Sequence, residues 1–284
     1  MKHYLSLLLF SISLTALGQQ APRDTVKTSD KPSLTLATLY SSNTNYYGQT
    51  TAGRFPYLLA YGGLAFNSGF SISATGYKIL NADGGGTGAD LTAGFDFNLS
   101  KNLSAGIGYT RSFFPDSSFF LQSQNLNMFS GKLGYDFNWL TAGLNADYNP
   151  GQEGALYLSF DVKKAIELIA FNQSDYISIE PAFEVVGSTQ QITSTEEVPS
   201  SSTQNKGLGI IKLPGKRSDQ KPEYRTVQST SFDVLSYNFK LPLAYSTRKF
   251  MVEAGYQASL ISRDTEASFK NPRSFFSLGL YYVL

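Results

Sequence analysis

Residues 89–110, ADLTAGFDFNLSKNLSAGIGYT, alternate apolar side chains with small or polar ones on both sides of a short turn. Leu91 and Phe95 occupy apolar positions of the first half, and Leu103 and Ile107 occupy those of the second half. Because successive side chains of a strand point to opposite faces, each half predicts a strand with one apolar and one polar face. The turn Ser100–Asn102 contains Asn, so the whole stretch predicts a β-hairpin.

Similar alternation continues through most of the chain and predicts about twelve strands, an even number as in single-chain bacterial barrels. Several runs are about ten residues long, whereas soluble strands usually have five or six, and about 9–11 residues cross a bilayer as a tilted strand. The clear runs lie at 89–99, 103–110, 129–137, 140–148, 177–185, 235–245, 250–260 and 276–284, and weaker ones at about 33–41, 56–66, 69–79 and 155–163.

The connections between these runs are alternately short and long, which is typical of a closed antiparallel transmembrane β-barrel with both ends in the periplasm. The tight periplasmic turns are predicted at Asn67–Gly69, Ser100–Asn102, Asn138–Trp139 and Ser246–Lys249. The longer external loops are predicted at 42–55, 80–88, 114–124, 188–229 and 262–272. Two connections fit poorly, because Asn149–Gly154 is short for an external loop and Lys164–Ser174 is long and partly apolar for a periplasmic turn.

The N-terminus carries the features of an exported protein. Lys2 precedes an apolar run at 4–15, and the small-x-small sequence at 16–18 predicts a signal peptide over residues 1–18. We expect residues 19–32 to form a disordered periplasmic tail and residues 33–284 to form the barrel. No later stretch approaches the roughly 18–20 apolar residues that a membrane helix needs.

Charge and residue usage limit the chemistry. Loss of Lys2 with the signal peptide reduces Lys+Arg from 23 to 22, against 22 Asp+Glu, and this balance argues against a nucleic-acid partner. The chain has no cysteine, and its one histidine, His3, lies in the predicted signal peptide. Serine–histidine catalysis is therefore excluded and zinc is disfavoured, so we expect no enzyme, no catalytic residue, no metal and no cofactor.

Residues 85–90, GGTGAD, match one copy of a glycine-rich calcium repeat. That motif works as a stacked array, whereas it stands alone here, so the preferred interpretation is an external loop.

Aromatic residues make up 14% of the chain, and several gather beside the predicted tight turns. A membrane barrel places such rings at the bilayer interface, where the apolar ring and its polar edge are both accommodated. A secreted β-sandwich also alternates with a period of two. It explains less well the long strands, the short and long connections, and a strand that ends at the last residue.

The chain resembles bacterial outer-membrane β-barrel proteins over nearly all of its predicted mature length. The resemblance rests on the hairpin 95–109 and on the C-terminal strand 277–284, SLGLYYVL, although the family usually ends in an aromatic residue rather than Leu284. It implies location in the outer membrane, contact with membrane lipid and lipopolysaccharide, and insertion by the barrel assembly machinery.

Charged residues on the polar face of the predicted strands are the candidate lumen lining. Two interpretations remain open: opposed charges neutralise each other and fill a narrow lumen, or they line a pore that selects solutes by charge. Glycines on the same face indicate that bulky neighbours fold over the wall, which favours a partly filled interior. The charged residues expected to face the lumen are Asp96, Lys132, Asp136, Asp147, Asp161, Glu180, Glu184, Lys240 and Glu253, and the candidate lining is Asp96, Lys132, Asp136, Glu180, Glu184, Lys240 and Glu253.

The predicted loop 188–229 contains a basic cluster, Lys212, Lys216, Arg217 and Arg225, around an apolar patch at 208–213. Four interpretations remain open: a plain solvated loop, a contact of the basic cluster with lipopolysaccharide phosphates, docking of the apolar patch on a protein partner, or a plug formed by that patch at the mouth of the barrel. The leading hypothesis for function is a porin-like, narrow channel for small polar solutes. The alternative is a non-conducting barrel that acts as a surface-binding or accessory subunit of an outer-membrane complex through its external loops.

Overall fold

The computed structural model describes residues 32–50, 53–81, 86–115, 126–150, 154–198, 223–262 and 272–284. The predicted signal peptide and residues 19–31 of the predicted tail lie outside these ranges. No helix in the described ranges is long and apolar enough to span a membrane. The strands are β1 Ser33–Ser41, β2 Tyr57–Ala65, β3 Phe70–Ile79, β4 Thr87–Asn98, β5 Leu103–Phe113, β6 Asn127–Asp136, β7 Thr141–Asn149, β8 Ala155–Lys163, β9 Ile166–Ala170, β10 Tyr176–Ile179, β11 Ala182–Val198, β12 Glu223–Ser246, β13 Phe250–Ile261 and β14 Arg273–Val283.

These segments form a closed antiparallel barrel of twelve strand positions, as the sequence predicted. Two of the twelve positions are each occupied by two consecutive segments, since β8 continues into β9 and β10 continues into β11. The breaks face each other at Lys164 and Pro181, where the Lys164 amide still donates to the Pro181 carbonyl at 3.2 Å. Proline has no amide hydrogen to donate to a ladder, which accounts for an interruption at this point.

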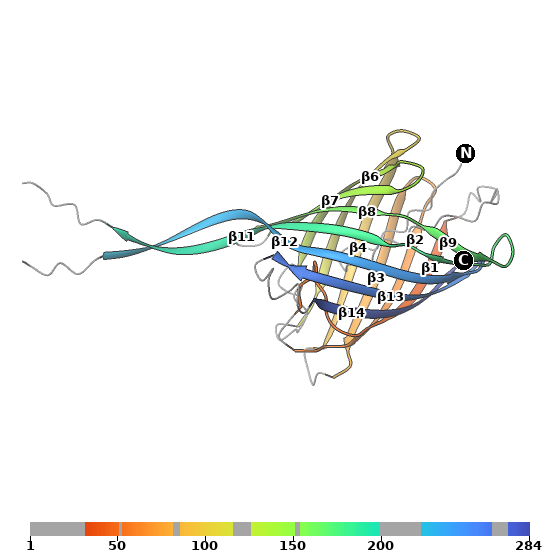
Figure 1. The fold of residues 1–284 in the computed structure, drawn as a ribbon, viewed down its shortest axis with the longest axis horizontal. Coiled ribbons are helices and arrows are strands. Elements are labelled where there is room, and N and C mark those ends of the chain that lie inside the picture. The colour runs from red at the N-terminus through yellow and green to blue at the C-terminus, as the bar shows by residue number, and fades with distance from the viewer. Residues whose placement is uncertain are drawn as a thin grey trace, which may run out of the picture. The chain divides into compact units, whose positions relative to one another are not determined.

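The ring closes where the first strand meets the last (Figure 1). β1 pairs with β14 from Thr35↔Val283 to Ser41↔Ser277, and with β2 on its other side. The remaining neighbours follow in chain order, and pairing of β11 with both β8 and β12 completes the ring. Except at the short β9, which pairs only with β10, each strand position therefore has a neighbour on both sides, as a strand structure in lipid needs.

All four predicted tight turns are confirmed, and they lie at one end of the barrel, here called the tight-turn end. Gly69 and Asn138 have positive φ angles of 93° and 70°, which sharp reversals require. The opposite end, here called the long-loop end, carries the connections after β1, β3, β5, β7 and β13, including the short one after Asn149.

The range Lys164–Ser174, which fits a periplasmic turn poorly by sequence, is not a single long turn. Most of that range is β9, and the chain reverses at 171–175, where the Phe171 amide donates to the Asp175 carbonyl at 2.8 Å. The apolar residues that made the range unusual for a turn belong to a strand, and Leu168 and Ile169 are exposed on it.

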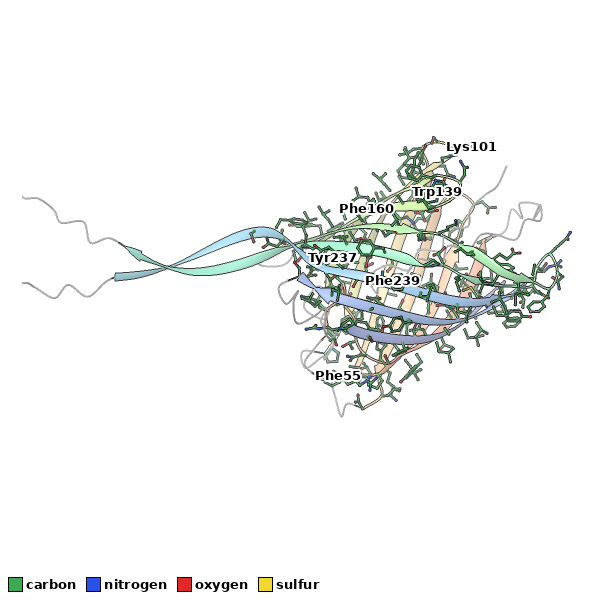
Figure 2. The ribbon with its side chains drawn as sticks, in the orientation of Figure 1. Phe55, Lys101, Trp139, Phe160, Tyr237 and Phe239 are labelled. Carbon is green, nitrogen blue, oxygen red and sulfur yellow. The ribbon has the colours of Figure 1, made fainter. Side chains whose placement is uncertain are left out.

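The outward face of the barrel is apolar. Leu91, Ile107 and Leu278 are more than half exposed although they lie within strands, and Figure 2 shows Phe160 and Phe239 on the outer surface. Soluble monomers rarely expose contiguous apolar patches of more than a few hundred Å². A continuous band of this kind around a barrel is the surface that a lipid bilayer covers.

Aromatic rings gather at both edges of this apolar band. At the tight-turn end, ring contacts join Phe95 to Phe97 at 5.9 Å and Phe250 to Tyr282 at 4.6 Å. Nearer the long-loop end, Tyr109 contacts Phe129 at 5.1 Å. The sequence predicted only the first of these two girdles.

Residues Thr189–Asp233 form a compact unit of their own. Its described parts are the second half of β11, to Val198, and the first half of β12, from Glu223. Strands thus occupy both ends of the range 188–229, where the sequence predicted one loop. The two end segments are rich in Thr, Val and Ile, which favour strands.

Candidate functional site: the barrel lumen

An ion pair joins the first two predicted lumen residues across an intervening strand. Lys132 Nζ on β6 lies 2.7 Å from Asp96 Oδ1 on β4, although β5 separates the two strands. Gly106 of β5 lies beneath the pair, and a Cβ atom there would overlap both side chains. The glycine therefore lets the two charges meet along the wall.

A second ion pair lies on the opposite part of the wall. Lys240 Nζ is 2.9 Å from Glu184 Oε2, which also accepts a hydrogen bond from Asn238 Nδ2 at 2.9 Å. Their side chains are only 7% and 13% exposed. A carboxylate so enclosed is stabilised by both the cation and the amide.

The other predicted residues lie closer to the tight-turn end. Glu180 forms a longer ion pair with Lys163, at 3.7 Å. Glu253 is buried on β13, and it makes no hydrogen bond or ion pair with any described residue. Asp136 ends β6 and accepts a hydrogen bond from the Asn138 amide at 2.7 Å, so it shapes a turn as well as facing inward. The structure thus joins Glu184 to Lys240 but leaves Glu253 outside that pair.

Asp161, which the alternation also predicted to face the lumen, accepts a hydrogen bond from Asn145. The lumen holds further charged groups that the sequence did not single out, among them Asp90, which accepts a hydrogen bond from the Tyr77 hydroxyl at 2.6 Å. Over the described inward positions, eight carboxylates face four cationic groups. The carboxylates are Asp90, Asp96, Asp136, Asp147, Asp161, Glu180, Glu184 and Glu253, and the cationic groups are Lys132, Lys163, Lys240 and Arg273.

Part of the glycine-rich stretch 85–90, interpreted from the sequence as an external loop, belongs to a strand, because β4 begins at Thr87. Residues 82–85 lie outside the described part of the chain, and Asp90 is a buried inward residue of β4 bound to Tyr77. Among the described residues, no group of three or more acidic or histidine side chains could hold a metal ion.

One side of the lumen is apolar and aromatic. The inward residues of β1, β2 and β3 form a buried cluster, and Phe114 packs against it with its ring stacked on that of Tyr77, 5.9 Å away. Elsewhere, a Cβ on Gly143 would overlap Asp161, and one on Gly279 would overlap Tyr281, so bulky side chains do fold over glycines as expected. The cluster comprises Leu39, Tyr57, Leu59, Tyr61, Tyr77 and Ile79.

Residues 43–50, here called the crossing segment, traverse the lumen at the long-loop end. They follow β1, yet the Tyr47 hydroxyl donates a hydrogen bond to Asp147 on β7, which is six positions away in either direction around the ring. The Tyr47 ring also stacks on Tyr157 of β8 at 4.4 Å and 11°. Its backbone carbonyl accepts a hydrogen bond from Ser236 Oγ of β12 at 2.7 Å. No pattern in the sequence indicates this crossing, because the composition of 42–55 is typical of an ordinary polar loop.

The electrostatic setting keeps Tyr47 a hydrogen-bond donor. Burial, and then the negative charge of Asp147, raises the pKa of Tyr47 well above its ordinary value. The phenol therefore stays neutral and donates to the carboxylate.

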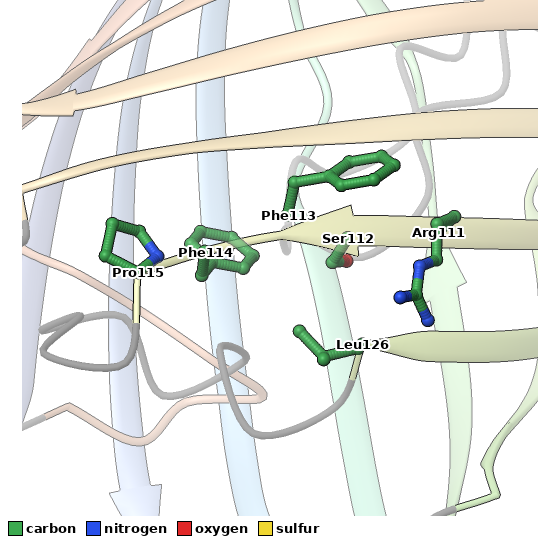
Figure 3. A pocket seen from close by; sticks show the side chains of 6 residues that line it. All are labelled: Arg111, Ser112, Phe113, Phe114, Pro115 and Leu126. Atoms are coloured by element: carbon green, nitrogen blue, oxygen red, sulfur yellow. The ribbon is translucent and has the colours of Figure 1, made fainter.

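A groove lies at the end of β5, lined by Arg111, Ser112, Phe113, Phe114, Pro115 and Leu126 (Figure 3). The Arg111 side chain already has partners there. Its Nη1 donates to Asn127 Oδ1 at 2.8 Å, and its guanidinium lies 5.7 Å from the Phe113 ring centre. The predicted contact residues Lys212, Lys216 and Arg217 lie outside the described residues, and Arg225 lies on β12 in the separate unit.

No protein-family model matches this chain, and no curated protein matches it. Among solved structures, the KdgM porin has a TM-score of 0.47 at 10% identity, over 87% of this chain and 98% of its own. The NanC porin has 0.44 at 10% identity, over 88% and 98%. The COG4313 outer membrane channel from Pseudomonas putida F1 has 0.45 at 12% identity, over 93% and 99%. These structural neighbours are outer-membrane β-barrel proteins, and the likeness concerns architecture alone.

Proposed function

We propose that this protein is exported through its N-terminal signal peptide to the outer membrane, where it forms a narrow channel that passes small polar solutes and prefers cations. The single observation that carries the proposal is the contrast between the two faces of the barrel. The outward face is an apolar band between aromatic girdles, whereas the inward face carries charged and amide side chains along its length. Lining charges of this kind set which ions enter a pore.

The preference for cations follows from the balance of inward charges. Three lysines are each paired with one carboxylate, at Lys132, Lys163 and Lys240. Glu253 faces the lumen with no such cation. An excess of carboxylates lowers the free energy of a cation in the lumen and raises that of an anion.

Conductance of the purified mature protein in planar bilayers tests this proposal. We expect discrete openings, and under a KCl gradient a reversal potential on the cation-selective side. Glu253→Gln removes an unpaired inward charge and should shift the reversal potential toward that of an unselective pore. Asp175→Asn, in the turn between β9 and β10, is the matched control and should leave it unchanged.

The alternative, a non-conducting accessory barrel, predicts a different result in the same experiment. Correctly folded protein would then show no openings, and a partner would co-purify through the region 188–229 or through lipopolysaccharide. That outcome would overturn the channel proposal.

A further inference from the structure

The crossing segment reaches from β1 to β7, β8 and β12, and the following inference rests on the proposed channel function. We propose that residues 43–50 are the selectivity filter of this barrel and that Asp147, held there by Tyr47, is the charge that selects cations at the filter. Tyr47 contacts β7, β8 and β12, whereas its own strand is β1. Solutes that pass along the barrel axis must pass beside these contacts.

The filter is a structured turn. The Tyr46 amide donates to the Gln49 carbonyl and the Gln49 amide donates back to Tyr46, each at 2.9 Å. The two residues between them have positive φ angles, 51° at Tyr47 and 83° at Gly48, as in the mirror-image turns of tight hairpins. Asn45 Oδ1 accepts a further bond from the Gly48 amide at 2.9 Å. These bonds keep the Tyr47 side chain aimed at β7.

Its base is fastened by Asn43. Asn43 Nδ2 donates to Thr50 Oγ1 at 2.9 Å, and Asn43 Oδ1 accepts from the Phe55 amide at 2.7 Å. The two ends of the segment are thus tied together beside β1, and only its tip reaches across.

The tip lies directly against β12. A Cβ atom on Gly48 would come within 2.5 Å of Asn238 Oδ1 and 2.8 Å of Ser236 Oγ, so the backbone touches the wall with no side chain between. Tyrosine is also an uncommon residue at positive φ, and residues in such conformations cluster at functional sites.

The chemistry around the tip favours cations. Asp147 is 8% exposed, and its Oδ2 accepts the Tyr47 hydroxyl, while no described cationic side chain is paired with it. Asn238 Oδ1, which lies against Gly48 on the β12 side, adds an amide oxygen. A solute that sheds part of its hydration here meets carboxylate, amide and phenol oxygens, which suit small cations and polar solutes and repel anions.

Two substitutions, measured in planar bilayers, separate the effect of the crossing segment on pore size from the effect of Asp147 on ion selectivity. Tyr47→Ala removes the side chain that bridges to β7 and should raise the single-channel conductance about twofold and admit larger polyethylene glycols. Asp147→Asn keeps an oxygen for the Tyr47 hydroxyl but removes the charge, so it should reduce the cation preference with little change in conductance.

Tyr148→Ala is the matched control, because Tyr148 is the outward neighbour of Asp147 and is 47% exposed. It should change neither conductance nor selectivity. Tyr47→Phe is a gentler second variant that retains the ring, and circular dichroism together with gel migration of unheated samples verifies that each barrel is folded.

The outcomes distinguish this inference from the channel proposal. If the native channel conducts and folded Tyr47→Ala and Asp147→Asn behave like it, the filter is refuted and the channel stands. If the native protein is closed but Tyr47→Ala conducts, the crossing segment is upheld as the narrowest point and the native channel function fails. If none of them conducts, both are overturned.

Discussion

The Tyr47 hydroxyl donates a hydrogen bond to the Asp147 carboxylate, which joins the segment after β1 to a strand on the far side of the barrel. Residues 100 positions apart in the sequence thus meet inside the lumen. The contact fixes the position of the tip of the crossing segment. The first prediction, on the ionisation of Tyr47, depends on it.

Ionisation of Tyr47 should weaken this contact only at high pH. Its pKa is raised above the ordinary value of 10.0 by burial and by Asp147, so its contribution to stability is complete below about pH 10 and is lost as the pH rises through the higher value. Tyrosinate absorbance of the native protein minus that of Tyr47→Phe should show one phenol that ionises well above pH 10. A difference curve centred at pH 10 or lower would contradict the contact.

Gly106 should be intolerant of a side chain, because its hydrogen lies under the Asp96–Lys132 ion pair. We expect Gly106→Val to lower the free energy of unfolding by about 1–3 kcal/mol through overpacking and separation of the charges. Gly131→Val is the control, since a Cβ at Gly131 meets nothing within 4 Å. Urea unfolding in lipid vesicles, followed by the fluorescence of the single tryptophan, Trp139, measures both, and equal losses would refute the explanation.

The ion pairs Lys240–Glu184 and Lys163–Glu180 should differ in their contribution to stability. Lys240→Met leaves Glu184 enclosed without its cation and should cost about 3 kcal/mol. Lys163→Met breaks a longer pair, at 3.7 Å, and should cost less than Lys240→Met. The double variant Glu184→Gln with Lys240→Met should recover part of the larger loss. Additive effects in that cycle would mean that the two side chains do not interact.

A charged side chain on the outward face should lower the free energy of unfolding strongly in the middle of the apolar band and only slightly at its edge. Ile107 is 60% exposed near the middle of β5, so Ile107→Lys should cost about 2–4 kcal/mol in a bilayer. Leu99, 57% exposed beside a tight turn, should tolerate Leu99→Lys at about 0–1 kcal/mol. The same vesicle unfolding assay tests both, and similar small costs would argue against lipid around Ile107.

The alternation of side chains allowed the strands and their faces to be predicted, because a period of two is a local property. The predicted inward residues Asp96, Lys132, Glu184 and Lys240 all face the lumen. The continuation of β8 into β9 was not predicted, because Lys164 and Ala165 interrupt the alternation of side chains. The apolar residues beyond them fit neither a turn nor a strand well. Which carboxylate pairs with which lysine was not predictable either, because Asp96 reaches Lys132 over an intervening strand.

By itself, the sequence determined that this chain builds a closed antiparallel barrel with an apolar outside and a charged inside, because strand geometry converts alternate positions into opposite faces. Only the tertiary structure decided that residues 43–50 turn inward and cross to β7, β8 and β12. Closure of the ring brings these distant strands to face one another around a narrow space. Contacts made across that space depend on positions around the ring, which no local pattern records.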